Sequence, residues 1–552
     1  ENEPHMLRIR GGTVYDPANN VNGEVRTICI SGGKVVADDP AQAGRTIDAT
    51  GMIVFPGGVD VHTHIGGAAL NFARGLIPEQ HRKATPIFHT PHTRAGIVGT
   101  TPTTFATGYV YAGMGWTTAN EAAVPILSAK HTHEELRDTP IIDKTCCVLM
   151  ANNELILDLL ENDEYERARE VAAWQIWAAK AYGIKAVNPG GVAGWKWGKD
   201  CKGLADVVPG YKKVTPAKII AALARIGDDL NLPHPVHLHC NNLGAPGNAS
   251  TTIETMKVLE GRRAHLAHLQ YHAYGGDDWF TMRSAAAEVA DHFNANPNLT
   301  ADAGAVLFGT TVTVTADGPW QHLLYQLTGR KWANLDVENE TGCGVVPYVY
   351  KEKNVVNAVQ WAVGLELLLL IDDPWRVCLT TDHPNGATFW RYPEIVQLLM
   401  SADFRKEQFK AFPDATRSRM VLPDLTREYT LSDIAVITSA GPARALGLAQ
   451  KGHLGVGADA DVAVYNHNTD VAAMFAHPRY VIKGGEVVVE EGELRQSPEG
   501  RQFAVKPRYD EAVEDYLRPL FQQHYTMSFE NYPVAPERVH GLEIVDGARD
   551  AG

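Results

Sequence analysis

The feature that most constrains the fold is a long run of alternating strand-like and helix-like stretches between two β-rich ends. Within residues 57–430, a helical stretch such as 216–230 is followed by a short apolar strand such as 235–239. Alternation of this kind over such a length is typical of a parallel sheet covered by helices. The size suits a (β/α)₈ TIM-like barrel, and we predict that α/β fold for residues 57–430.

The two ends of the chain share a pattern of short strands and glycine turns. Near the start the chain reads Ile9-Arg-Gly-Gly-Thr-Val14, and near the end it reads Ile482-Lys-Gly-Gly-Glu-Val487. We therefore predict one small, discontinuous β domain built from residues 1–56 and 431–505. The alternative is two unrelated hairpins. Residues 506–552 begin with a helical pattern, and we predict that they form a C-terminal arm suited to a partner subunit.

Composition argues against several classes of protein. Lys plus Arg number 50 and Asp plus Glu number 65, so the formal charge is −15, whereas nucleic-acid-binding chains are net basic. No apolar run is long enough for a membrane span. Residues 1–10 lack the apolar core of a signal peptide. We therefore expect neither nucleic acid nor membrane as a partner, and a cytoplasmic location.

Cysteine and histidine usage point in different directions. The seven cysteines are scattered and contain no C-x-x-C pair, which favours neither a disulfide framework nor a zinc or iron–sulfur site made of cysteines. The 22 histidines are more informative, because several stand in closely spaced pairs.

The most distinctive histidine pair ends an apolar strand in the string Phe55-Pro-Gly-Gly-Val-Asp-Val-His-Thr-His64. Residues two apart on a strand point to the same face, so His62 and His64 can hold one metal ion. Such a pair alone is weak evidence. The pair His131 and His133, for example, stands in a capping-box pattern, and we expect it at the start of a surface helix.

Three further strings end strand-like stretches with possible metal ligands. Asp382, in Thr381-Asp382-His383-Pro384, can bind a metal and carry a proton, although an aspartate before a proline turn is often only a cap. For any one of the histidines, a hydrogen-bonded buried imidazole is the ordinary interpretation. Strand ends of one barrel meet at one mouth, however, so the joint pattern favours a metal site. The histidines concerned are His237, His239, His265, His268 and His272.

A lysine in the short apolar strand at 184–187 is unusual. Burial of Lys185 beside cations would lower its pKa below the usual ~10.4. A neutral amine can capture carbon dioxide and become a carbamate able to bridge two metal ions. The sequence permits this modification of Lys185.

These strings resemble the metal motifs of the amidohydrolase superfamily. Pro56-Gly-Gly-Val-Asp-Val-His-Thr-His64 resembles the first motif, and Thr381-Asp382-His383-Pro384 resembles the last, as found in dihydroorotases and hydantoinases. The stretch 440–462 resembles the superfamily's return into its flanking β domain. This resemblance covers residues 6–490.

Three strings resemble a narrower family, the A subunits of formylmethanofuran dehydrogenase and of the bacterial formyltransferase/hydrolase complex. They are Ile184-Lys-Ala-Val-Asn-Pro-Gly-Gly191, His237-Leu-His-Cys-Asn-Asn-Leu-Gly244 and Ala267-His-Leu-Gln-Tyr-His-Ala-Tyr-Gly275. This narrower resemblance covers nearly the whole chain.

The resemblance implies two zinc ions bridged by N6-carboxylated Lys185. His62, His64 and Asp382 would hold the more buried ion, and His239 and His268 would hold the other. His237 and His272 stay open as alternative ligands. Asp382 would also carry the proton from the attacking water to the departing amine.

The activity that the resemblance implies is hydrolysis of the formamide of formylmethanofuran, or of its bacterial analogue, to formate and the free amine. The chain would work as the hydrolase subunit of a formyltransferase/hydrolase complex in one-carbon metabolism. One alternative is the equivalent subunit of a formylmethanofuran dehydrogenase complex, and another is a cyclic amidase of the dihydropyrimidinase or dihydroorotase type. A non-catalytic scaffold is disfavoured, because all six expected ligand positions are filled. The possible substrate contacts, each with an ordinary loop role as the first expectation, are Tyr109, Tyr111, Asn188, Asn241, His81, His89 and His92.

Overall fold

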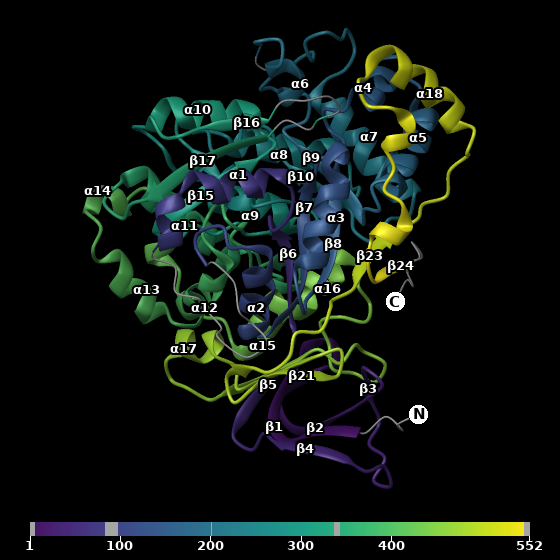
Figure 1. The fold of residues 1–552 in the computed structure, drawn as a ribbon. Coiled ribbons are helices and arrows are strands. Elements are labelled where there is room, and N and C mark those ends of the chain that lie inside the picture. Colours follow the sequence, from purple (N-terminus) through teal and green to yellow (C-terminus); the bar gives the residue numbers. More distant parts are fainter. Residues whose placement is uncertain (1–5, 83–97, 200, 336–339, 341–342, 546–552) are drawn as a thin grey trace.

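A near-closed barrel of eight parallel strands with helices around it forms the centre of the molecule, as predicted (Figure 1). The computed structural model describes residues 6–82, 98–199, 201–335, 340 and 343–545. Neighbouring barrel strands pair in chain order, and a bridge between Thr63 and His383 joins the last strand to the first. The strands are β6 (Gly58–Thr63), β7 (Trp116–Val124), β8 (Asp143–Leu149), β9 (Gly183–Val187), β10 (Val236–His239), β11 (Ala264–Leu266), β14 (Leu299–Asp302) and β18 (Val377–Cys378).

Helices between consecutive strands cover the outside of the barrel. Their first turns carry the side-chain caps that the sequence offers: Thr103 accepts a hydrogen bond from Ala106 N, and Thr215, followed by Pro216, accepts one from Lys218 N. The helices are α2 (Thr104–Gly113), α3 (Ala129–Asp138), α4 (Glu154–Glu161), α5 (Tyr165–Ala178), α7 (Pro216–Asp229), α8 (Ala249–Val258), α9 (Ala286–Asn294), α11 (Val355–Leu370) and α12 (Tyr392–Met400).

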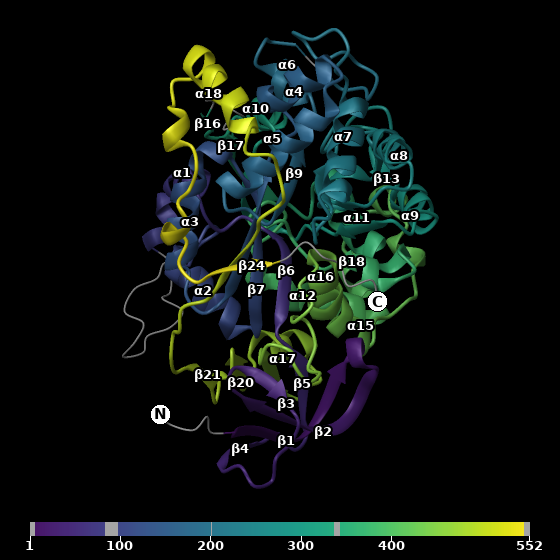
Figure 2. The same ribbon diagram turned by 90° about the vertical axis from the view of Figure 1, so that its right-hand side faces the viewer.

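One sheet at the amino-terminal end of the barrel combines both ends of the chain (Figures 1 and 2). The junction is the antiparallel pairing of β5 with β19, in which Phe55 lies opposite Ala463. The alternative of two unrelated hairpins is therefore wrong. The strands of this sheet are β1 (Met6–Asp16), β2 (Val21–Ser31), β3 (Lys34–Val36), β4 (Gly44–Asp48), β5 (Met52–Pro56), β19 (Val462–Asn466), β20 (Tyr480–Lys483), β21 (Glu486–Glu490) and β22 (Glu493–Leu494).

The C-terminal segment folds back along the side of the barrel. Its strands β23 (Gln502–Val505) and β24 (Leu542–Val545) extend the barrel sheet beside β8, and α18 (Val513–His524) packs on α5 (Figure 2). Trp174 of α5 stacks on Phe529 and Tyr532 at ring-centroid distances of 5.3 and 5.2 Å. The boundaries predicted at residues 56, 430 and 505, and a partner for the arm, stay predictions.

The histidine pair on α3 shows how this segment changes the expected surface. The helix begins at Ala129, and His133 is only 2% exposed, so the expected surface helix start is wrong for that residue. Its ring contacts Gln502 Oε1 of β23 at 2.9 Å and the carbonyl of Ala179 at 2.7 Å. A strand 369 residues away in the sequence therefore buries it.

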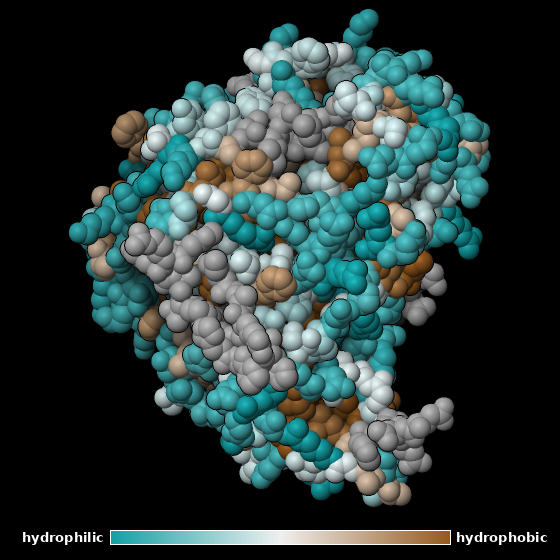
Figure 3. All heavy atoms as spheres, viewed as in Figure 1, coloured by the Kyte–Doolittle hydropathy of each residue, from teal (hydrophilic) through white to brown (hydrophobic). Residues whose placement is uncertain are grey.

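A small sheet inserted between β14 and β18 lies over the carboxyl ends of the barrel strands. It consists of β15 (Gly309–Thr315), β16 (Ala333–Leu335) and β17 (Cys343–Tyr350), with α10 (Gly318–Thr328) between the first two. None of the described helices is both long and apolar enough to cross a membrane. The face of the molecule in Figure 3 is mostly hydrophilic, with hydrophobic residues in separate small patches.

A buried cluster of charges joins the barrel to the β domain. Lys451, which is 5% exposed, contacts Asp143 of β8, Asp461 at 2.6 Å and Asp459 at 3.0 Å. Lys483 of β20 contacts Asp143 at 2.9 Å. The three carboxylates stand close enough together for a metal ion, but the ammonium groups already neutralise them.

Replacing Lys451 by Met should destabilise the protein strongly, by about 3–5 kcal/mol, because buried carboxylates lose their partner. The measurement is the free energy of unfolding in urea. Lys406→Met is the control, since Lys406 is an exposed helix residue whose pair with Asp403 is worth at most about 1 kcal/mol. Equal effects of the two substitutions would contradict the role given to the cluster.

Candidate metal centre

The six residues predicted as metal ligands lie together at the carboxyl ends of the barrel strands. They come from five strands or the turns that follow them, and none is more than 7% exposed. A cavity of about 420 Å³ opens above them. The five that line it are His64, Lys185, His239, His268 and Asp382.

Asp382 is the centre of the arrangement. Its Oδ1 lies 3.0 Å from Nε2 of His62 and 3.0 Å from Nε2 of His64. Ligand atoms of His62, His268 and Asp382 all lie within 4.8 Å of one another, which links the two halves of the site. Asp382 and His268 both have the left-handed backbone that non-glycine residues rarely adopt, with φ of 51° and 35°. Such strain is found where a side chain must be aimed at a functional site.

Three buried carboxylates that the sequence analysis missed orient the imidazoles from outside. His62 Nδ1 lies 2.9 Å from Asp302, and His64 Nδ1 lies 3.0 Å from Glu121. His239 Nε2 lies 3.0 Å from Asp317, the N-cap of α10. A carboxylate accepts the ring N–H, so the opposite nitrogen of each ring carries the lone pair.

These lone pairs suit a divalent cation. Those of His62 and His64 face the carboxylate of Asp382, and that of His239 faces His268 Nε2 at 3.1 Å. Acceptors that converge in a buried place repel one another unless a proton or a metal ion lies between them. Imidazoles backed by carboxylates are the usual arrangement around a protein-bound metal. The donor set of nitrogen and carboxylate oxygen fits zinc.

The charges of the site agree with this arrangement. Burial opposes a charged imidazolium, yet bonds to Asp382 and Glu121 raise the pKa of His64 to about 9. Burial also opposes the charge on Asp382, but the facing rings of His62 and His268 hold the pKa of that carboxyl well below its usual range. The site therefore attracts positive charge to the space beside Asp382.

Lys185 lies on the wall of this cavity, within β9. Its Nζ is 3.5 Å from His62 Nε2, and the side chain is 1% exposed. Burial lowers the pKa of Lys185 to about 8, although Asp382 and Asp302 oppose the shift. An appreciable fraction of the amine is therefore neutral near physiological pH.

The alternative histidines take different places. His237 does not line the cavity; its Nε2 lies 3.1 Å from His62 Nδ1, on the side of that ring away from Asp382. His272 is fully buried beside His239 and His268, and neither of its ring nitrogens has a hydrogen-bond partner among the described residues. Its nitrogens lie within 4.8 Å of theirs. A ligand role for His272 therefore stays open.

Of the side chains considered for substrate contact, none that the structure describes lines the cavity. Tyr111 instead donates to Asp60 at 2.7 Å, deep beneath the site. Asn188 is held by Asp317 and Asn241. The side chains of three candidates lie outside the described part of the chain: His81, His89 and His92.

The cavity walls are mainly aromatic, and no sequence pattern pointed to the residues that form them. They come from the segment after β11, from α10 and from the inserted sheet. The aromatic side chains are Tyr271, Trp279, Trp320, Tyr348 and Tyr350.

The fold and the site define a metal-dependent hydrolase, and the comparison with known proteins agrees. Residues 45–489 match the Amidohydrolase family, so the chain belongs to that family. It is a metal-dependent amidohydrolase.

Two proteins are similar to this chain over almost its whole length. Protein FwdA of Methanocaldococcus jannaschii is 41% identical over 97% of this chain and 98% of its own. The A subunit of the formyltransferase/hydrolase complex Fhc of Methylorubrum extorquens is 38% identical over 96% of each chain. A crystal structure of that complex, FhcABCD with methylofuran, contains a chain that is 37% identical with a TM-score of 0.92 and covers 99% of this chain and 100% of that one.

Replacing Asp302 by Asn should weaken metal binding roughly 10- to 100-fold, because the amide no longer accepts the N–H of His62 as a charged partner. The measurement is the apparent metal dissociation constant in competition with a chelator. Glu366→Gln is the matched control: this carboxylate is also fully buried, but its partners are Ser284 and the backbone of Val421 and Leu422. An Asp302→Asn protein that binds metal as tightly as the control would contradict the orienting role.

Proposed function

We propose that the chain hydrolyses the formamide bond of formylmethanofuran, or of its bacterial counterpart, to formate and the free amine. The observation that carries this proposal is the near-full-length similarity to the Fhc hydrolase chain of Methylorubrum extorquens, whose complex was crystallised with methylofuran. The supporting chemistry is a cavity with histidines, a lysine and a carboxylate on its floor and aromatic side chains on its walls. We propose a cytoplasmic location and the other subunits of a formyltransferase/hydrolase complex as partners.

Two zinc ions are the proposed metals. His62, His64 and Asp382 would hold one, and His239 and His268 would hold the other. When bound, the ions would act as Lewis acids toward the formyl oxygen and the attacking water. Asp302, Glu121 and Asp317 keep the imidazoles turned toward the cavity.

Lys185 is the proposed bridge between the two ions. Its neutral amine would attack carbon dioxide, form an N–C bond and release one proton, which leaves a carbamate anion. Burial disfavours the competing ammonium form, which supports the modification. The position also supports it, because the amine faces His62 at 3.5 Å and lines the cavity floor beside His239.

Asp382 is the proposed proton carrier. Its carboxylate stays ionised, so it can accept the proton of the attacking water. The same carboxyl would then deliver that proton to the departing nitrogen, which leaves as the free amine while the C–N bond breaks. The remaining walls exclude water: Tyr271 and Tyr350 are each 4% exposed.

Two alternatives keep the same floor residues. The equivalent subunit of a formylmethanofuran dehydrogenase complex would differ in its partner chains and not in this site. A cyclic amidase is disfavoured by the segment around Trp195-Lys-Trp197 and by the Asn241-Asn-Leu-Gly244 string. Chains that copurify with the native protein distinguish the first alternative, and competition between substrates distinguishes the second.

The carbamate should form on Lys185 and not on Lys144. Lys144 is equally buried, at 1% exposed, and burial lowers its pKa to about 8 as well. Its Nζ, however, donates to the carbonyl of Thr139 at 2.8 Å and does not line the cavity. Peptide mass spectrometry after trapping of carbamates by alkylation should find the added carboxyl at Lys185 alone. Bicarbonate depletion should also lower metal content, and an unmodified Lys185 in fully metal-loaded protein would contradict the bridge.

Replacing Asp382 by Asn should lower the rate of formate release by at least ~100-fold, because the amide cannot accept the proton. Formate released from formylmethanofuran by the native complex is measured for both proteins, with metal content determined in parallel. Loss of rate with metal retained supports the proton-carrying role.

Formate release by the unchanged complex tests the substrate itself, with a dihydropyrimidine as the competing substrate. No formate from metal-loaded complex, together with hydrolysis of the dihydropyrimidine, would overturn the formamide proposal in favour of a cyclic amidase.

A further inference from the structure

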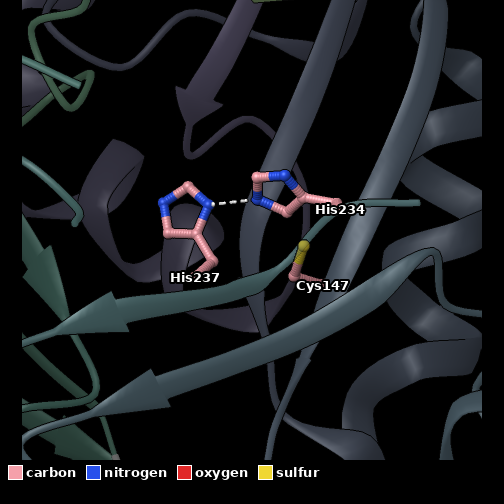
Figure 4. Close-up of side chains that lie close together, drawn as sticks. All are labelled: Cys147, His234 and His237. Atoms are coloured by element: carbon pink, nitrogen blue, oxygen red, sulfur yellow. Dashed lines mark hydrogen bonds between the residues drawn. The ribbon is translucent and has the colours of Figure 1, made fainter. Parts of the chain in front are cut away.

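A chain of three buried imidazoles runs from His62 down through the barrel interior. His237 Nε2 lies 3.1 Å from His62 Nδ1, and His237 Nδ1 lies 3.0 Å from His234 Nε2 (Figure 4). His234 Nδ1 lies 2.6 Å from the carbonyl oxygen of Ala445, in α16 (Gly441–Leu446). All three rings are 0% exposed. No step of the proposed reaction uses His234 or His237.

The carbonyl at the lower end fixes the direction of the chain. A carbonyl oxygen only accepts, so His234 carries its proton on Nδ1 and offers the lone pair of Nε2. His237 must then donate from Nδ1 and offer the lone pair of Nε2. Burial lowers the pKa of both rings well below the usual range, so each ring has one donor and one acceptor.

The opposite direction would place two acceptors against each other at both ends. His234 Nδ1 would face the carbonyl of Ala445 at 2.6 Å without a proton. At the upper end, His62 Nδ1 would face the carboxylate of Asp302 at 2.9 Å without a proton. A buried acceptor left without a donor costs roughly 1–3 kcal/mol, so the structure favours one direction only.

The same residues do not form a separate metal site, although Cys147 Sγ lies close to both rings (Figure 4). The facing nitrogens of His234 and His237 already share a proton with each other. The thiol contacts Asn120 at 3.8 Å, and burial raises its pKa to about 12. A metal ion there would have to break a satisfied hydrogen bond and deprotonate this thiol.

We propose that His237 and His234 are positioning residues that fix the tautomer of His62 through this one-way chain of N–H···N bonds. Two acceptors, His237 Nε2 and Asp302 Oδ2, converge on His62 Nδ1. The ring must therefore be protonated at Nδ1 and present the lone pair of Nε2 toward Asp382. The inference rests on the proposed role of His62 as a metal ligand. It assigns to His237 a place behind the ligand, in contrast to a ligand role of its own.

The test is zinc affinity, measured by chelator competition on the native complex, and it needs no substrate. His237→Leu removes the acceptor behind His62 and should weaken zinc binding roughly 10- to 100-fold. His237→Gln keeps an acceptor oxygen there and should recover a large part of this loss. His234→Leu removes the distant end of the chain and should cause a smaller loss than His237→Leu.

His133→Leu is the matched control. It also removes a buried imidazole whose two nitrogens are both bonded, but its partners, Gln502 and Ala179, have no path to His62. It should lower thermal stability and leave zinc affinity unchanged. The proposal is overturned if His237→Leu binds zinc as tightly as the unchanged protein, if Leu and Gln at 237 lose affinity equally, or if His133→Leu loses as much.

A failure of the proposed function gives a different result. The complex would then release no formate while the ordered losses of zinc affinity persist. If His62→Asn retains full zinc affinity, the premise of the chain itself is wrong.

Discussion

Closure of the barrel between its first and last strands is the constraint on which the site depends. His64 N donates to the carbonyl of His383 at 2.8 Å, and this contact brings the turn after β18 against the end of β6. Asp382 thereby reaches the ring nitrogens of His62 and His64, both at 3.0 Å. A carboxylate and imidazole lone pairs in a buried place are costly without a cation, so the closure only becomes favourable together with metal binding. Folding and metal loading should therefore be coupled in this protein.

The polar interior of the barrel is organised in layers that support the site. Beneath His62, the carboxylate of Asp60 accepts hydrogen bonds from Tyr111 and Tyr392 at 2.7 and 2.6 Å. Beside it, Asp302 accepts from Thr380 at 2.6 Å and from the backbone of His268 at 3.0 Å. Because donors from several strands hold these two carboxylates, the ligand geometry above them is preorganised.

Much of this architecture could be predicted from the sequence, because periodicity and strand ends are local properties. The barrel and the sheet shared by both chain ends followed from alternation and from two similar glycine-containing strings. The residues that support the site could not be found in this way. Asp317 reads as an ordinary helix cap, and its contact with His239 joins residues 78 positions apart. The burial of His133 depends on β23, which is 369 positions away. Long-range pairings of this kind leave no local pattern.

The central claim is that the barrel mouth holds two metal ions, one on each side of Lys185. The most direct measurement is anomalous X-ray diffraction at the zinc absorption edge from crystals of the zinc-loaded protein. We expect two peaks per chain, one beside His62, His64 and Asp382 and the other beside His239 and His268. A single peak, or peaks located elsewhere, such as beside Cys147, would contradict a binuclear centre and the chemistry derived from it.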